Sequence, residues 1–171
     1  MPQAMNNSSA SKNDWEKVRA LIAQSLLHGA GLGQDLGITY ARGAFLPDGS
    51  AAPVVDDPVN DYEPSARPGS RAPHLWIEWQ GVKLSTLDVV GGKFVLLAGP
   101  DYNPVTQDTD SVTVLRNERD FVADGFEELY GISSNGAVLV RPDGYVGARW
   151  VQLPKNFRGQ FRSALTSILR T

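Results

Sequence analysis

The side chains that most often carry out protein chemistry are scarce in this chain of 171 residues. It contains no cysteine, which excludes disulfides, thiolate zinc sites, iron–sulfur clusters and thiol redox chemistry. Its two histidines, His28 and His74, are too few for most histidine metal sites. Serines are plentiful, but neither histidine has a serine or an acid beside it in the sequence with the character of a catalytic triad. We therefore predict no catalytic residue, no cofactor-binding residue and no metal ligand.

Two stretches resemble ligand-binding motifs but lack the context that those motifs require. The glycine-rich residues 29–33 close a predicted helix, whereas a dinucleotide-binding fingerprint opens a helix directly after a strand. The acidic residues between 56 and 63 lack the Asp-x-Asp-x-Asp-Gly order and the distal glutamate of a calcium loop. We interpret the first stretch as a helix end and the second as a solvated acidic loop.

Composition excludes further classes of function. The 16 lysines and arginines against 19 aspartates and glutamates give a formal charge of −3, which provides no general attraction to nucleic acid or to an anionic membrane. The basic residues of the last predicted helix are interpreted as its solvated face. No apolar run is long enough to span a bilayer, and the first residues do not have the pattern of a signal peptide. We expect a cytoplasmic protein that binds neither nucleic acid nor membrane.

The clearest element that could position side chains is a predicted β-hairpin over residues 136–150. Residues 137–140 are an apolar run, and residues 145–150 begin a second strand-like run. The Arg-Pro-Asp-Gly of residues 141–144 suits a turn, because proline presets φ and glycine accepts positive φ. Both sides of the first strand are largely apolar, so we expect it inside a sheet that is covered on both faces.

The patterning of the whole chain predicts an α/β domain with a central mixed sheet. Strands of this sheet are expected near residues 83–88, 93–98, 111–116, 136–141 and 145–150, and helices near residues 14–29 and 156–169. Residues 75–80 alternate like a half-buried strand, residues 37–44 could make another short strand, and a short helix is expected to end at Gly131.

The chain divides by composition into three parts. Residues 1–12 are small and polar and are expected to be disordered. Residues 13–73 combine a helix with a proline-rich connector that should lie extended over the surface. Residues 74–171 form the β-rich domain.

The first helix carries an apolar stripe that something must cover. Asn13 and Glu16 form a capping-box pattern, and glycines 29, 31 and 33 are expected to end the helix. The stripe consists of Trp15, Val18, Leu21, Ile22, Leu26 and Ala30. It could dock on the chain's own sheet, on a partner domain, or on a second copy of the chain. We favour a two-fold dimer, which Leu26→Asp should separate into monomers.

Several stretches resemble a known family once the order of the elements is in view. The order of strands and helices in residues 74–171 is thioredoxin-like. The stretches Tyr62-Glu63-Pro64-Ser65, Pro68-Gly69-Ser70-Arg71-Ala72-Pro73-His74, Ser85-Thr86-Leu87-Asp88, Phe94-Val95-Leu96-Leu97-Ala98-Gly99 and 136–144 look like the C-terminal region of FAD-dependent aromatic-ring hydroxylases of the phenol/chlorophenol monooxygenase type. The likeness covers about residues 15–169.

The resemblance implies a non-catalytic thioredoxin-like module that contributes packing and subunit contacts. In the family, FAD and NAD(P)H are used by an enzyme whose flavin and substrate are held by preceding domains, and the corresponding motifs have no counterpart here. The chain would be part of such a hydroxylase or a free-standing relative that binds one. The alternative is an independent enzyme or small-molecule binder that uses the loop of residues 99–108, around Asp101 and Tyr102.

Overall fold

The computed structural model describes residues 16–19, 31–103 and 111–170. In chain order its elements are α2 (Leu32–Leu36), β1 (Trp76–Trp79), β2 (Val82–Ser85), β3 (Phe94–Ala98), β4 (Val112–Arg116), β5 (Phe121–Val122), α3 (Phe126–Tyr130), β6 (Ala137–Val140), β7 (Val146–Trp150) and α4 (Phe157–Leu169). Among these described elements, no helix is long and apolar enough to cross a membrane.

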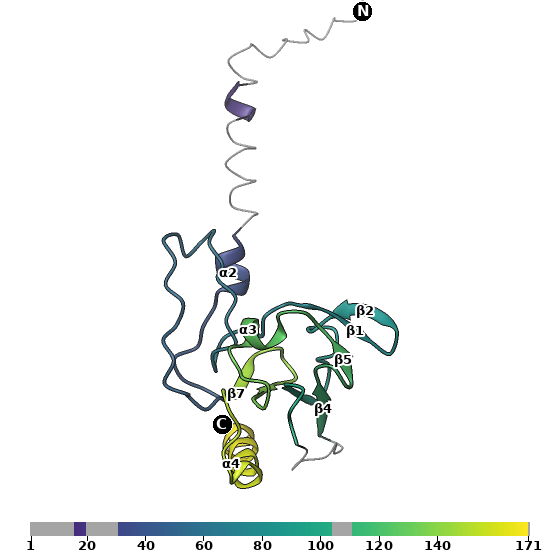
Figure 1. Ribbon diagram of the computed structural model, residues 1–171. Helices are drawn as coiled ribbons and strands as arrows, with labels where there is room; N and C mark the ends of the chain where they lie inside the picture. The colour runs from purple at the N-terminus through teal and green to yellow at the C-terminus, as the bar shows by residue number, and fades with distance from the viewer. Residues whose placement is uncertain (1–15, 20–30, 104–110, 171) are drawn as a thin grey trace, which may run out of the picture.

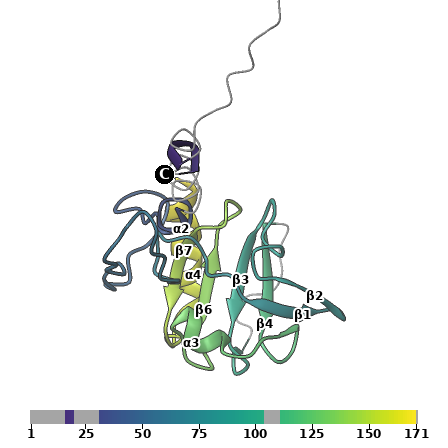
Figure 2. The same ribbon diagram turned by 90° about the horizontal axis from the view of Figure 1, so that it is seen from above.

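The centre of the molecule is a four-stranded sheet in the order β4-β3-β6-β7, which Figure 2 shows. β3 and β4 are parallel, whereas β3 with β6 and β6 with β7 are antiparallel. A parallel neighbour needs a crossover connection, which here runs through residues 99–111. The sheet is therefore mixed, as predicted, and the α/β fold class is confirmed.

The predicted hairpin is confirmed as the pair β6–β7. All four residues of β6 are buried, because the strand has a neighbour on either side and helices on both faces. The Arg141 amide donates to the Tyr145 carbonyl at 2.8 Å, and Gly144 takes the positive φ of 82° that the turn requires. A bulge between Leu139 and Val140 shifts the register.

Alternate residues of the central strands form two apolar clusters on opposite faces of the sheet. Val138 and Val140 lie in one cluster with α3, whereas Leu139 lies in the other with Phe157 and Phe161 of α4. Figure 1 shows α3 and α4 on opposite sides of the sheet. Full burial of such a side chain stabilises the fold by roughly 1.5–3 kcal/mol. The helix predicted to end at Gly131 is α3, and that predicted near 156–169 is α4.

A second, three-stranded sheet has the order β2-β1-β5 and corrects one prediction. The strand expected near residues 83–88 was placed in the central sheet, but Val82–Ser85 pairs only with β1. It ends early because the Ser85 amide donates to the Asp88 carboxylate at 2.8 Å, and the Leu87 amide donates to Ser85 Oγ at 3.0 Å. The predicted alternation of residues 75–80 is confirmed in β1.

The amino-terminal predictions are only partly met. Residues 16–19 are helical, and the remainder of the helix expected near 14–29 lies outside the described residues. Gly33 does not end a helix, because it lies inside α2, where a Cβ would approach the Pro58 carbonyl oxygen to 2.3 Å. The strand suggested over residues 37–44 is reduced to a single bridge between Thr39 and Ser70.

Candidate functional site

The proline-rich connector is fastened along the free edge of β7. The Leu46 amide donates to the Gly147 carbonyl at 2.8 Å, and the Gly69 amide donates to the Val146 carbonyl at 2.9 Å. The Val146 amide donates in turn to the Ser70 carbonyl at 2.9 Å. The connector therefore satisfies backbone groups that an uncovered edge strand would expose. It was predicted to lie extended over the surface; its attachment to this edge was not predicted.

Charged side chains reinforce this attachment. Arg149 of β7 pairs with Asp48 at 2.7 Å, and Arg67 Nε donates to the Ser50 carbonyl at 2.9 Å. Burial raises the pKa of Asp48, but hydrogen bonds from Ser50 and Arg149 together lower it below its ordinary value. The Asp48 carboxylate is therefore held in its charged form at neutral pH, where it links the connector to the sheet.

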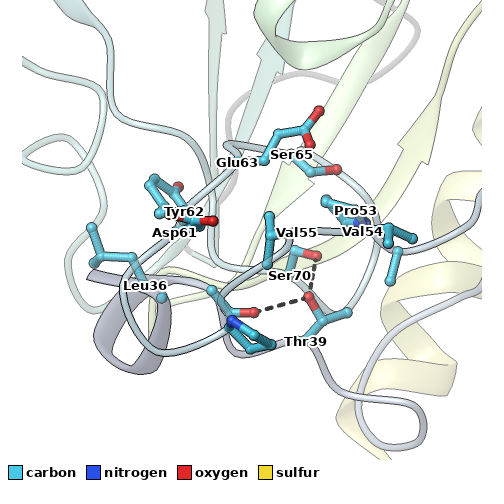
Figure 3. Close-up of a pocket in the computed structure, with 14 residues that line it drawn as sticks. Leu36, Thr39, Pro53, Val54, Val55, Asp61, Tyr62, Glu63, Ser65 and Ser70 are labelled. Carbon is cyan, nitrogen blue, oxygen red and sulfur yellow. Dashed lines mark hydrogen bonds between the residues drawn. The ribbon is translucent and has the colours of Figure 1, made fainter. Parts of the chain in front are cut away.

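A pocket of about 410 Å³ opens between α2 and the two arms of the connector. Its walls are formed by Gly33, Leu36, Gly37, Thr39, Ala52, Pro53, Val54, Val55, Pro58, Asp61, Tyr62, Glu63, Ser65 and Ser70. Figure 3 shows the hydroxyls of Thr39 and Ser70 facing each other, with Oγ1 and Oγ 3.0 Å apart. Its charged lining consists of the carboxylates Asp61 and Glu63, and no histidine, lysine or arginine is among the described residues that line it, so these residues offer no cationic charge for an oxyanion.

Large apolar side chains are exposed around this pocket. They are Leu32 at 54%, Ile38 and Tyr40 at 47%, Val54 at 91% and Val59 at 37% of their accessible area. We call these five residues the connector surface. Figures 1 and 2 show the connector at the opposite end of the molecule from β1 and β2. Five exposed apolar side chains within residues 32–59 give this segment apolar area that a contact with another protein segment would cover.

The structure brings together one histidine–serine pair that sequence analysis did not find. His74 Nδ1 lies 2.7 Å from Ser85 Oγ, although the two residues are eleven positions apart. The serine oxygen also accepts the Leu87 amide, and the Asp88 carboxylate accepts the Ser85 amide rather than bonding His74. With no acid to orient the imidazole, the pair closes a turn and does not form a catalytic triad.

The loop considered as an alternative site is partly a core element. Tyr102 is only 1% exposed, and its ring meets Phe157 of α4 edge-on at 5.9 Å. Asp101 is exposed, and its amide donates to the Ser134 carbonyl at 2.8 Å. The Tyr102 ring is therefore committed to packing. Residues 104–108 of the proposed loop lie outside the described residues.

A metal ion and the phosphates of FAD each need a particular arrangement of groups. Among the described residues, no three histidine, aspartate or glutamate side chains are grouped as metal ligands. A flavin diphosphate needs a strand, a glycine-rich loop and the amino end of a helix. Where β5 leads into α3, the first turn carries Glu127 and Glu128, whose charges repel phosphate. The first turn of α2 carries Asp35. His28 lies outside the described part of the chain.

Comparison with known proteins identifies the family. The family described as "Aromatic-ring hydroxylase, C-terminal" matches residues 65–170. The chain therefore belongs to this family, and the resemblance found in the sequence is confirmed. The matched range includes both sheets, α3 and all of α4, and it begins within the connector.

The relatives are monooxygenases of much greater length. Tetracenomycin A2 monooxygenase-dioxygenase of Streptomyces glaucescens is 35% identical over 169 residues, which cover 92% of this chain and 28% of that protein. 2,4-Dichlorophenol 6-monooxygenase of Delftia acidovorans is 32% identical over 151 residues, covering 80% and 26%. The chain thus spans less than a third of these relatives and matches only their C-terminal module.

Solved structures give the same result. The flavin-dependent monooxygenase PieE, in complex with FAD and substrate, aligns with a TM-score of 0.69 and 33% identity, over 95% of this chain and 30% of that one. A ternary complex of aklavinone-11 hydroxylase with FAD and aklavinone aligns with a TM-score of 0.68 and 28% identity. The relatives are thus FAD-dependent aromatic hydroxylases, and the arrangement described above is that of their C-terminal module.

Proposed function

We propose that this chain is a non-catalytic, thioredoxin-like module of a flavin-dependent aromatic hydroxylase, or a free-standing relative that binds one. The observation that carries the proposal is the connector surface. It leaves five large apolar side chains exposed beside the pocket, in a family whose other members have most of their length in additional segments. A preceding flavin-binding part would cover this surface, and FAD and NAD(P)H would be used there.

The division of the chain supports the same proposal. Residues 13–73 would join the module to the preceding part, and residues 74–171 would be the thioredoxin-like domain. The predicted cytoplasmic location and the disorder of residues 1–12 stay predictions. A two-fold dimer through the first helix is a further proposal, which sedimentation of the wild type and of Leu26→Asp tests.

A chimera provides the direct test. In it, this chain replaces the matched segment of 2,4-dichlorophenol 6-monooxygenase, and the FAD content and stability of the purified protein are measured. We expect Ile38→Asp, which places a charge on the connector surface, to weaken the contact with the flavin-binding part. Val122→Asp is the matched control, because Val122 is 57% exposed at the other end of the molecule. Equal behaviour of the two variants would contradict the proposal.

A flavin titration of the isolated chain tests the non-catalytic assignment. Because Glu127 and Glu128 occupy the first turn of α3, we expect no saturable change in flavin fluorescence at micromolar FAD. Stoichiometric quenching, or a yellow protein after purification, would show that the chain holds flavin by itself. The same result would favour the alternative of an independent enzyme.

A further inference from the structure

Half-buried arginines are a distinctive feature of this molecule. Within the part of the chain that the structure describes, these are Arg67, Arg71, Arg116, Arg141 and Arg149. Four of them donate to an acceptor. Arg116 and Arg149 reach aspartates at 2.7 Å, Arg67 reaches the Ser50 carbonyl at 2.9 Å, and Arg141 reaches the Ala44 carbonyl at 3.0 Å. Burial of a guanidinium is thus generally compensated in this fold.

Arg71 is the exception. Its Nε is buried and has no hydrogen-bond partner, which is true of no other buried side-chain nitrogen or oxygen in the described residues. Within the same residues, no carboxylate lies within 4.0 Å of its guanidinium. Burial of a charged donor without an acceptor opposes folding, since the water that it loses is not replaced. Because the residue as a whole is only half-buried, a turn of the guanidinium would bring this donor to an acceptor that comes from elsewhere.

The surroundings of Arg71 are aromatic hydroxyls. Its backbone bridges to that of Tyr145 at the start of β7, and the rings of Tyr145 and Tyr40 are 5.1 Å apart. Burial raises the pKa values of Tyr62 and Tyr145, and the nearby Arg71 charge opposes this rise in both. A side-chain hydrogen bond between Arg71 and Tyr145 also lowers the pKa of Tyr145, so within the guanidinium it is the Nε that lacks a partner. Tyr40 belongs to the connector surface. Arg71 therefore lies beside the proposed contact region, among phenol groups that can donate further hydrogen bonds.

We propose that Arg71 is the receptor for a carboxylate that the described residues do not supply. A carboxylate is planar and presents two oxygens, so it can accept from Nε and from a second guanidinium nitrogen side by side. It could belong to an acidic side chain of the flavin-binding part, a source that rests on the proposed function. It could equally belong to a small carboxylic acid that binds the chain alone.

The first experiment uses the chain alone with sodium acetate as the probe. Acetate is added against sodium chloride at constant ionic strength, and the Nε–H signal of Arg71 is followed by nuclear magnetic resonance, assigned by its loss in Arg71→Gln. Melting temperature is measured in parallel. We expect a saturable shift and an acetate-specific rise in melting temperature, both absent in Arg71→Gln and retained in Arg42→Gln. Arg42 is the matched control, because it is an exposed arginine of the same connector.

The second experiment tests the other source in the hydroxylase chimera. If the carboxylate is a side chain of the flavin-binding part, Arg71→Gln should shift the docking equilibrium between the two covalently joined parts about tenfold toward the undocked state, the loss of one charge-assisted hydrogen bond, and this shift is measured as a lower melting temperature of the chimera. Arg42→Gln should leave the docking equilibrium unchanged, and acetate should compete with docking. If the source is a small acid, acetate binds the isolated chain and docking is unaffected.

The outcomes separate this proposal from the proposed function. An Arg71-dependent response in either experiment supports the carboxylate receptor. If the isolated chain does not respond to acetate and Arg71→Gln docks like the wild type, the receptor is overturned, even where Ile38→Asp still disrupts the chimera. A response to inorganic phosphate without a response to acetate also overturns it. If the two parts of the chimera do not dock on each other at all, the acetate experiment alone tests the carboxylate receptor.

Discussion

The central sheet and the connector are held in place by different forces. Every residue of β3 and β6 is buried, and each strand has apolar clusters on both faces. The connector contributes one buried aromatic ring, Phe45, and two small core residues, Ala66 and Ala72. It is also attached through backbone hydrogen bonds, the hydrogen bond from Arg141 to the Ala44 carbonyl and the Asp48–Arg149 pair. Its large apolar side chains mostly face outward. The sheet thus has a complete core of its own, whereas the connector surface resembles one side of an interface.

The largest effect should follow a cavity in the sheet. Leu139 is fully buried on β6 against α4, so Leu139→Ala should lower the free energy of unfolding by about 2–5 kcal/mol. Val54→Ala in the connector, where the side chain is 91% exposed, should change it by less than about 0.5 kcal/mol. Urea unfolding followed by circular dichroism measures both. Equal losses would remove the distinction between the two regions.

A smaller effect is expected at the aromatic anchor of the connector. Phe45 is 8% exposed, and its ring lies against Gly69. Phe45→Ala should cost about 1.5–3 kcal/mol if the connector unfolds together with the sheet. If the connector instead detaches first, the main unfolding transition will keep its midpoint while protease cleaves within residues 41–66. Limited proteolysis together with urea unfolding separates these two results.

The ionic attachment should matter less and should depend on pH. Because the folded state lowers the pKa of Asp48 below its ordinary value of 3.8, its stabilising contribution is present above that pH. It is lost as the pH falls through the lower, folded-state pKa. Asp48→Asn should therefore cost about 1 kcal/mol at neutral pH, and the difference from the wild type should shrink in acid.

Asp120→Asn is the matched control within the body of the domain. Asp120 pairs with Arg116 at 2.7 Å, and this hydrogen bond is the largest cause of its lowered pKa. Both variants should show the same sign of pH dependence in urea unfolding. Only Asp48→Asn should make the connector more sensitive to protease, and similar sensitivity in Asp120→Asn would argue against a local role for the Asp48 pair.

Sequence patterns predicted the elements that are built from local signals. The hairpin around residues 141–144 and the helix near residues 156–169 follow from turn chemistry and helical periodicity, and both were located correctly. The separate pairing of Val82–Ser85 was not, because a strand's pattern shows which face is buried but not which sheet it joins. The thioredoxin-like order came from resemblance, and its mixed sheet is confirmed.

The candidate site was harder to predict because its features depend on contacts between distant segments. The attachment of Leu46 to Gly147 uses backbone groups, which every residue possesses. The proximity of His74 to Ser85 depends on how β1 and β2 pair. Arg71 Nε lacks a hydrogen-bond partner among the described residues, and no sequence motif marks such a missing contact. The absence of thiol chemistry stays a prediction from composition, because the thiolate is the reacting species and the chain has no cysteine.

The smallest expected change in the free energy of unfolding distinguishes two arginines at the connector whose partners differ. Arg149 and Arg71 both lie at the junction of β7 with the connector, but only Arg149 has a carboxylate partner among the described residues. Arg149→Met leaves Asp48 unpaired and should destabilise the chain by about 1 kcal/mol. Arg71→Met removes a buried Nε donor that has no acceptor, but it also removes the hydrogen bond between Arg71 and Tyr145. Because these two losses oppose each other, the free energy of unfolding of the isolated chain should change by less than about 1 kcal/mol.

Both variants are compared by urea unfolding in chloride, without added carboxylate. Arg71→Met keeps an unbranched aliphatic stem and removes the guanidinium, so the lost charged group is the main difference. In acetate the wild type should be more stable than Arg71→Met, because only the wild type gains a carboxylate partner for its guanidinium. A loss of about 1 kcal/mol or more for Arg71→Met in chloride would mean that Arg71 already stabilises the isolated fold. In that case its guanidinium would have a structural role that its missing Nε partner does not reveal, and the contrast with Arg149 would disappear.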